Sequence, residues 1–232
     1  MPNNLTLSNA KLVSILQALI VYSFVFNPWT SFPYTFIIII ISILVLVYWT
    51  DKTFAKIGFI LSHSILKTIG IALTIFLITS PILDFIIQPL VNKVTGDTVD
   101  FSAFQALAHN FKLYSKYALF VLISAAFGEE ILFRGFLFRQ LNIILPEFKF
   151  KTQTMVFVSA ILFSIPHWYQ GLSGLIMTFI FGILFATVYV KFKYNLWVTI
   201  ILHGLIDTLF LTLAYYEKLD YYVLGNDFLF GY

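Results

Sequence analysis

The sequence predicts an all-α protein that crosses a membrane several times. Of its 232 residues, 60% are hydrophobic and only 11% are charged, whereas soluble domains carry about 25% charged residues. A soluble surface cannot be built from so few charges. Residues 36–49 also lack a polar face at helical period, so a very apolar soluble core does not account for them.

Two long stretches, residues 12–50 and 152–190, contain no Asp, Glu, Lys or Arg. Each is 39 residues long, and at about 1.5 Å per residue it would form a helix of roughly 58 Å, nearly twice a hydrocarbon core of about 30 Å. Turn-forming residues lie near the middle of each stretch, at residues 27–33 and 166–171. We therefore expect each stretch to form a hairpin of two membrane-spanning helices.

Three further apolar stretches carry polar residues within them. They are residues 68–91, with Pro81 and Asp84; residues 116–145, with Glu129, Glu130, Arg134 and Arg139; and residues 196–216, with His203 and Asp207. In total we expect about seven transmembrane helices, or six to eight, within a single membrane-embedded domain over residues 1–232. The first apolar stretch, Leu12 to Phe26, has no signal-peptide cleavage pattern and is interpreted as a retained helix.

The distribution of Lys and Arg predicts a cytoplasmic N-terminus. With that orientation nine of these residues fall in inner segments and four in outer segments, when Arg134 is counted as intramembrane. The longest polar stretch, residues 92–116, is expected at the membrane interface or as a small cap over the spans.

The composition also excludes several classes of function. The chain has no cysteine, so it has no disulfide framework and cannot be a cysteine protease. Its net charge of +3 is spread along the sequence, which argues against nucleic acid as a partner.

Two adjacent carboxylates in one apolar span call for a physical reason, because an ionised side chain at the bilayer centre costs about 2.5–3.5 kcal/mol. Glu130 and Arg134 are four residues apart, in the order that favours an ion pair on one helical face. This pair can hold two helices together without any chemistry. Glu129 lies about 100° round the helix and has no local partner, so we expect its partner on another helix and a role as general base.

Two other spans deliver histidines to similar depth. Phe163 and His167 are four residues apart, with Pro166 interrupting the helix just before the histidine, and His203 and Asp207 are four apart on one helical face. Bundled helices bury such groups facing one another, so the sequence predicts a polar intramembrane cavity. His63 and His109 lie near predicted helix ends and are given no catalytic role.

The three elements Glu129-Glu130-x-x-x-Arg134, Phe163-x-x-x-His167 and His203-x-x-x-Asp207, in this order, resemble the CAAX prenyl protease and bacteriocin-processing family of intramembrane endopeptidases, also called abortive-infection proteins. The resemblance covers about residues 95–216, which would form the protease-like core. It implies an enzyme of the bacterial plasma membrane in which Glu129 activates water and His167 helps to position it. His203 and residue 207 would stabilise the oxyanion, and Glu130 with Arg134 would order the helix that carries the base.

The sequence departs from the commoner family pattern at Asp207, where an Asn often stands. An ionised Asp is a poor oxyanion donor. Asp207 therefore is protonated, orients His203 or ligates a metal. Glu129, His167, His203 and Asp207 together could hold a divalent ion such as zinc, but the His-Glu-x-x-His spacing of soluble zinc proteases is absent. We favour a glutamate-dependent mechanism with no obligatory metal.

Two other functions compete with peptide hydrolysis. Intramembrane carboxylates and histidines also build the proton relays of transporters, although no inverted repeat is visible here. A member that has lost catalysis would act as a scaffold or immunity protein. The expected partners are the lipid bilayer and a membrane-associated or lipidated peptide or protein, and the sequence does not choose among a prenylated C-terminus, a leader peptide and a membrane anchor.

Overall fold

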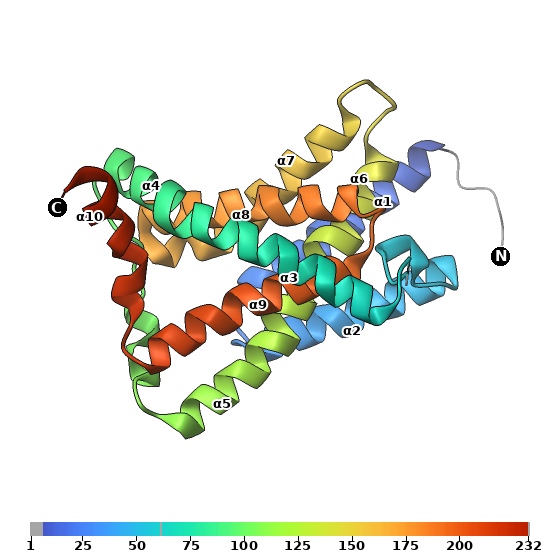
Figure 1. Cartoon of the computed structure of the whole chain (residues 1–232). Coiled ribbons are helices and arrows are strands. Elements are labelled where there is room, and N and C mark those ends of the chain that lie inside the picture. Colours follow the sequence, from blue (N-terminus) through green and yellow to red (C-terminus); the bar gives the residue numbers. More distant parts are fainter. Residues whose placement is uncertain (1–6, 61, 232) are drawn as a thin grey trace.

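The computed structural model describes residues 7–60 and 62–231, and all regular structure in this part of the chain is helical (Figure 1). The first half contains α1 (Leu7–Ser23), α2 (Tyr34–Asp51), α3 (Ile65–Ile82), α4 (Gln88–Thr95) and α5 (Phe111–Phe120). The second half contains α6 (Leu137–Ile144), α7 (Lys151–Ser164), α8 (Gly171–Lys191), α9 (Leu196–Tyr215) and α10 (Leu224–Phe230).

Within the described residues, five helical segments are long and apolar enough to cross a membrane. They are Ser8–Phe26, Tyr34–Asp51, Ile65–Thr95, Lys151–Lys191 and Leu196–Tyr215. The fourth contains both α7 and α8, which double back on each other. The predicted all-α, polytopic membrane fold is thereby confirmed.

The second predicted hairpin forms where the sequence places it. α7 ends at Ser164, a short 3-10 helix covers Ile165–Gln170, and α8 begins at Gly171. α7 and α8 then pack along each other. The two helices lie close together at Gly182, where an added Cβ would lie 2.8 Å from the Cα of Ala160, so only glycine permits this spacing.

Two long helices contain wide turns in which backbone hydrogen bonds span five residues. α3 continues through a π-helical turn, Leu83–Ile87, into α4. α5 continues through π-helical segments at Val121–Glu129 and Ile131–Phe136 into α6, giving one helix from Phe111 to Ile144. Such turns are rare and often occur at functional sites.

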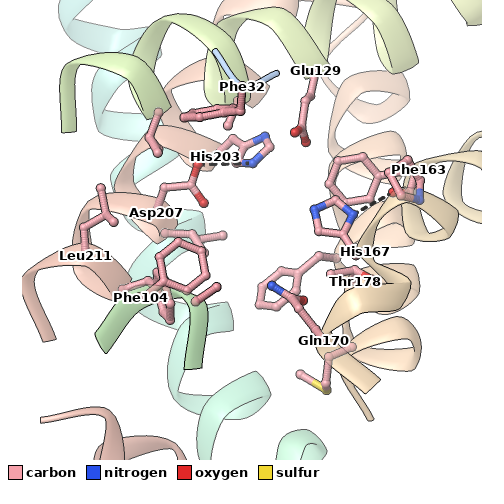
Figure 2. A pocket seen from close by; sticks show the side chains of 18 of the residues that line it. Phe32, Phe104, Glu129, Phe163, His167, Gln170, Thr178, His203, Asp207 and Leu211 are labelled. Carbon is pink, nitrogen blue, oxygen red and sulfur yellow. Dashed lines mark hydrogen bonds and ion pairs between the residues drawn. The ribbon is translucent and has the colours of Figure 1, made fainter. Parts of the chain in front are cut away.

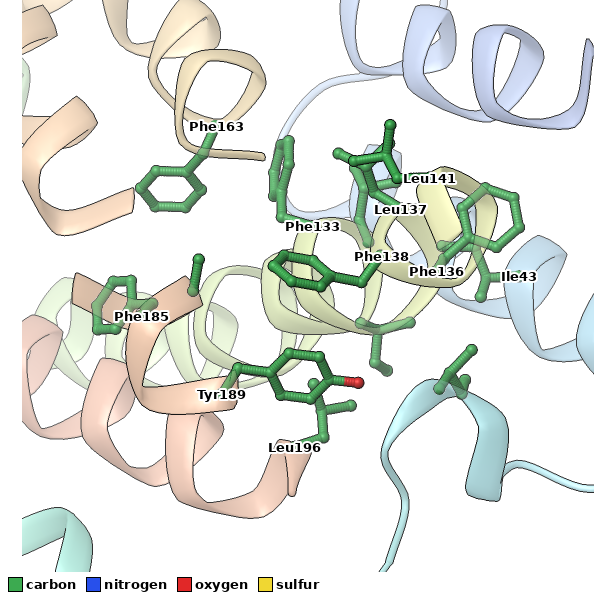
Figure 3. Packing of buried hydrophobic residues seen from close by; sticks show 14 of the residues in the cluster. Ile43, Phe133, Phe136, Leu137, Phe138, Leu141, Phe163, Phe185, Tyr189 and Leu196 are labelled. Carbon is green, nitrogen blue, oxygen red and sulfur yellow. The ribbon is translucent and has the colours of Figure 1, made fainter. Parts of the chain in front are cut away.

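The main hydrophobic core surrounds the centre of this second helix. Phe133, Phe136, Leu137 and Phe138 are almost fully buried there, and Phe163, Phe185 and Tyr189 pack from α7 and α8 (Figure 3). The residues Ile131–Phe136 are all buried. The segment with the paired glutamates is therefore enclosed by protein on every side and does not face lipid.

Two short elements pack against the ends of α9 and α4. The predicted cap is found in part as a 3-10 helix, Ser102–Leu107, which packs against α9. The C-terminal segment follows α9 and returns to pack on α4 and the turn before it (Figure 1). At that contact an added Cβ on Gly225 would lie 2.5 Å from Pro89 and 2.8 Å from the carbonyl of Phe85.

Candidate active site

A charged cluster lies at the centre of the molecule, without access to solvent. Oε1 of Glu130 is 3.0 Å from Nη1 of Arg134, and both side chains are 0% exposed. The same oxygen is 3.0 Å from Nδ1 of His203 on α9. Arg134 also donates from Nη2 to the carbonyl of Gly182 on α8, at 3.3 Å. The predicted Glu130–Arg134 pair is present, and it joins three parts of the bundle.

Aromatic rings enclose this cluster. The guanidinium of Arg134 lies 4.4 Å from the ring centre of Phe163 and 5.1 Å from that of Phe185. His203 stacks on Phe185 with ring centres 4.6 Å apart and planes 20° apart. Cations gain stabilisation over aromatic faces, especially where water is excluded. These rings therefore fix the positions of Arg134 and His203 and offset part of the cost of burying their charge.

The other predicted residues line a cavity of about 630 Å³ next to the cluster. Glu129, His167, His203 and Asp207 all contribute to its wall, and most of the remaining lining is apolar. Figure 2 shows the Glu129 carboxylate directed into the space between the rings of His203 and His167. The structure thus brings together all six predicted site residues, four at the cavity and Glu130 with Arg134 behind it.

The hydrogen bond of His167 determines which of its nitrogens faces the cavity as an acceptor. Nδ1 lies 3.0 Å from the backbone carbonyl of Phe163 (Figure 2). A carbonyl oxygen can only accept, so Nδ1 carries the proton. In the neutral ring Nε2 then has a free lone pair. Pro166, in the 3-10 turn that follows α7, places this ring at the cavity wall.

Asp207 and Glu129 differ in their surroundings. Oδ2 of Asp207 lies 3.4 Å from Nε2 of His203, so both nitrogens of His203 face carboxylate oxygens. Glu129 makes no hydrogen bond or ion pair with any described residue, although it is buried, with only 9% of its surface exposed. Its carboxylate is therefore available to a molecule in the cavity.

The donor atoms of the predicted metal ligands are spread around the cavity wall. Among the described residues, no three His, Asp or Glu side chains converge in a way that would hold a metal ion. His203 is engaged at both nitrogens, by Glu130 and by Asp207. Of the four candidate ligands, this arrangement leaves His167 and Glu129 as those with free lone pairs toward the cavity.

Some lining residues were not predicted from the sequence as part of the site. Asp84 and Gln88 contribute from the helix Ile65–Thr95, and Tyr222 contributes from the C-terminal segment. The sequence does contain a signal for Asp84, because a carboxylate in an apolar span is unusual. However, no charged residue or histidine lies three or four positions away to indicate a site there. His109 lies apart from the cavity, 3.7 Å from Glu217 with both side chains exposed.

The chain was compared with protein families, curated proteins and solved structures. Residues 112–209 match the family model described as type II CAAX prenyl endopeptidase Rce1-like. No curated protein and no solved structure matches the chain. The matched segment contains all six predicted site residues and the whole α7–α8 hairpin.

Proposed function

We propose that this protein, whose residues 112–209 match the family model of Rce1-like type II CAAX prenyl endopeptidases, hydrolyses a peptide bond of a membrane-associated substrate inside the cavity. In this proposal Glu129 is the general base. The observation that carries the proposal is the arrangement of Glu129, His167, His203 and Asp207 around one largely apolar cavity of about 630 Å³. This volume suits a few residues of an extended peptide together with a water molecule.

The first step is activation of water by Glu129. The carboxylate has no protein partner among the described residues, so it can accept a proton from a water in the cavity. Nε2 of His167 accepts the second hydrogen of that water, because Nδ1 already donates to Phe163. Two acceptors on opposite sides direct the oxygen lone pair of the water toward a peptide carbonyl placed between them.

The second step is stabilisation of the oxyanion. His203 is held between Glu130 and Asp207, an arrangement that suits a protonated imidazole with both N–H groups donating. The contact to Asp207 is the longer of the two, so Nε2–H is the donor that can turn toward a developing negative charge. The tetrahedral intermediate then collapses as Glu129 returns its proton to the leaving amine, giving a carboxylate and an amine.

Asp207 acts in this scheme by orienting His203. Its position supports that role among the three left open by the sequence, since its Oδ2 lies 3.4 Å from Nε2 of His203. We further propose that no metal is obligatory, because the candidate ligands do not converge on one point and His203 is engaged at both nitrogens. If a metal binds, Glu129 and His167 are the residues best placed to hold it, and it would supply Lewis acidity to a bound water.

The test is a comparison of membrane proteomes from cells that carry the wild-type protein or the Glu129→Gln variant. We expect specific peptides to accumulate uncut with the variant, because an amide cannot accept the proton. His167→Ala is expected to give the same uncut peptides. Purified protein in vesicles is then assayed on synthetic versions of those peptides.

Matched substitutions control for loss of folding. Glu147→Gln makes the same chemical change on a side chain that is 89% exposed. His63→Ala removes a histidine that does not line the cavity. If Glu129→Gln and His167→Ala both insert normally and leave cleavage unchanged, Glu129 is not the base and the proposal is wrong.

A further inference from the structure

The cavity has a second polar wall, formed by the helix Ile65–Thr95, which takes no part in the chemistry proposed above. Ser80, Asp84 and Gln88 follow one another at four-residue spacing, so they share one face of that helix. All three line the cavity, and they are only 7%, 5% and 5% exposed, respectively. Buried polar groups in a membrane helix are costly unless they meet a partner.

The hydrogen bonds of this wall leave its acceptor atoms free. Tyr221 donates to Oδ2 of Asp84 at 3.2 Å, while Gln88 donates from Nε2 to Asn92 at 3.2 Å. Neither Oδ1 of Asp84 nor Oε1 of Gln88 accepts a hydrogen bond from any described residue. The hydroxyl of Ser80 makes no hydrogen bond to the described residues either. Each of the three side chains thus presents an unused acceptor.

The hydrogen-bond partners of Asp84 and Gln88 are themselves held in place. Burial, together with the neighbouring Asp84, raises the pKa of Tyr221 to about 12, so its hydroxyl stays protonated and donates. Asn92 is held from the other side by the hydroxyl of Ser173 on α8, at 2.6 Å. The carboxylate and the amide are therefore positioned before any ligand arrives.

Acidic residues are in excess on the cavity wall. Asp84, Glu129 and Asp207 line the cavity, and the described part of its lining contains no Lys or Arg. His203 also lines it, but its two nitrogens already face Glu130 and Asp207. Asp84 has no ion pair within the described residues. A buried carboxylate is stabilised by a cation with matching donors. The cation that fits must come from the ligand.

We propose that Asp84, flanked by Ser80 and Gln88, forms a subsite that binds a cationic nitrogen of the peptide substrate. The inference rests on the proposed function, because it takes the contents of the cavity to be a peptide. Four residues of helix rise about 6 Å, so Ser80 and Gln88 each lie about one turn from Asp84 along the helix. An ammonium offers three N–H donors and a guanidinium five. A carboxylate of the substrate would be repelled from this end of the cavity.

The test measures peptide binding in the absence of cleavage. Full-length Glu129→Gln protein in vesicles is offered acetylated and amidated peptides that are identical except at one scanned position, which carries Lys, norleucine or Glu. At one or two of the scanned positions we expect the Lys peptide to bind about 10- to 100-fold more tightly than the norleucine peptide. The Glu peptide should bind more weakly than either. A second arm uses a free N-terminus in place of Lys and shows which amine the subsite takes.

Substitution of Asp84 ties the preference to this residue. Adding Asp84→Asn is expected to make Lys and norleucine peptides bind equally, with norleucine binding unchanged. Tyr221→Phe keeps the carboxylate and should reduce the preference only in part. Thr74→Ala is the matched control. Thr74 lies on the same helix, is exposed, and its hydroxyl donates a hydrogen bond to the backbone carbonyl of Gly70. This variant should keep the full preference for Lys peptides.

The outcomes separate this inference from the proposed function. Equal binding of Lys and norleucine peptides by protein with Asp84 intact overturns the subsite, and so does a preference that survives in Asp84→Asn. Either result is compatible with cleavage by the wild-type protein. A charge preference that depends on Asp84, in a protein that cleaves nothing, supports the subsite and contradicts the proposed function.

Discussion

Nδ1 of His203 lies 3.0 Å from Oε1 of Glu130, although the two residues are 73 positions apart in the sequence. The same carboxylate oxygen lies 3.0 Å from Arg134. Glu130 is thus shared by two basic side chains on different helices, and it is not part of the cavity lining. Its place in the molecule explains how two adjacent glutamates can differ in role: Glu130 holds the site together and Glu129 faces the ligand.

The first prediction concerns the stability of this cluster. Glu130→Gln removes the charge that pairs with Arg134 and leaves a cation buried without compensation. We expect a loss of about 3–5 kcal/mol in the free energy of unfolding, measured by denaturation of the protein in detergent. Glu147→Gln is a matched control, because Glu147 and Lys151 form a pair of the same spacing whose glutamate is 89% exposed. Because the Glu147 carboxylate lies in water, that pair should contribute about 1 kcal/mol or less. Equal effects of the two substitutions would contradict the role given to Glu130.

The second prediction separates Glu129 from Glu130. Glu129 has no hydrogen bond or ion pair with the described residues, so Glu129→Gln removes a buried charge without breaking a contact. The free energy of unfolding should stay the same or rise. Activity should fall by about 10²- to 10⁴-fold, the usual contribution of a general base. Both quantities can be measured on the same preparation. A destabilisation like that of Glu130→Gln would show that Glu129 is a structural residue.

Charge spacing along the sequence was enough to predict the helices and their turns. The stretch 152–190 without charges became α7 and α8, with the turn at Pro166. The Glu130–Arg134 pair could also be predicted, since it lies within one helix and depends only on spacing. Both predictions concern residues that are close in the sequence.

Contacts between helices could not be predicted in the same way. The pairing of Glu130 with His203 depends on how two helices pack, and no periodicity in either helix specifies it. The wide turns at Val121–Phe136 were missed because π-helical hydrogen bonding has no sequence signature comparable to a helix cap. Asp84 was noted only as a polar residue within the stretch 68–91, and its place in the lining of the same cavity as Glu129 follows from the packing of the helices.

The third prediction concerns the close packing of α7 and α8. An added Cβ at Gly182 would lie 2.8 Å from the Cα of Ala160, and the carbonyl of Gly182 accepts from Arg134. Gly182→Ala should therefore force the helices apart and destabilise the protein by about 1–3 kcal/mol. Gly70→Ala is the control, because nothing lies within 4 Å of an added Cβ there, and alanine favours a helix over glycine by about 1 kcal/mol. Thermal denaturation of the two variants should move in opposite directions. A neutral result at Gly182 would mean that the hairpin tolerates a wider spacing.

The fourth prediction concerns Asp207. If Asp207 orients His203 through the contact at Nε2, then Asp207→Asn keeps an oxygen for that contact and adds an N–H that can donate to the oxyanion. Cleavage by this variant should stay within about 10-fold of wild type, whereas Asp207→Ala, which leaves His203 unsupported, should lose about 10²- to 10³-fold. The measurement is kcat/KM on a peptide identified by the proteomic comparison. A loss in Asp207→Asn as large as in Asp207→Ala would show that the negative charge itself is required, as for a metal ligand, since an amide oxygen reproduces the shape of the carboxylate without its charge.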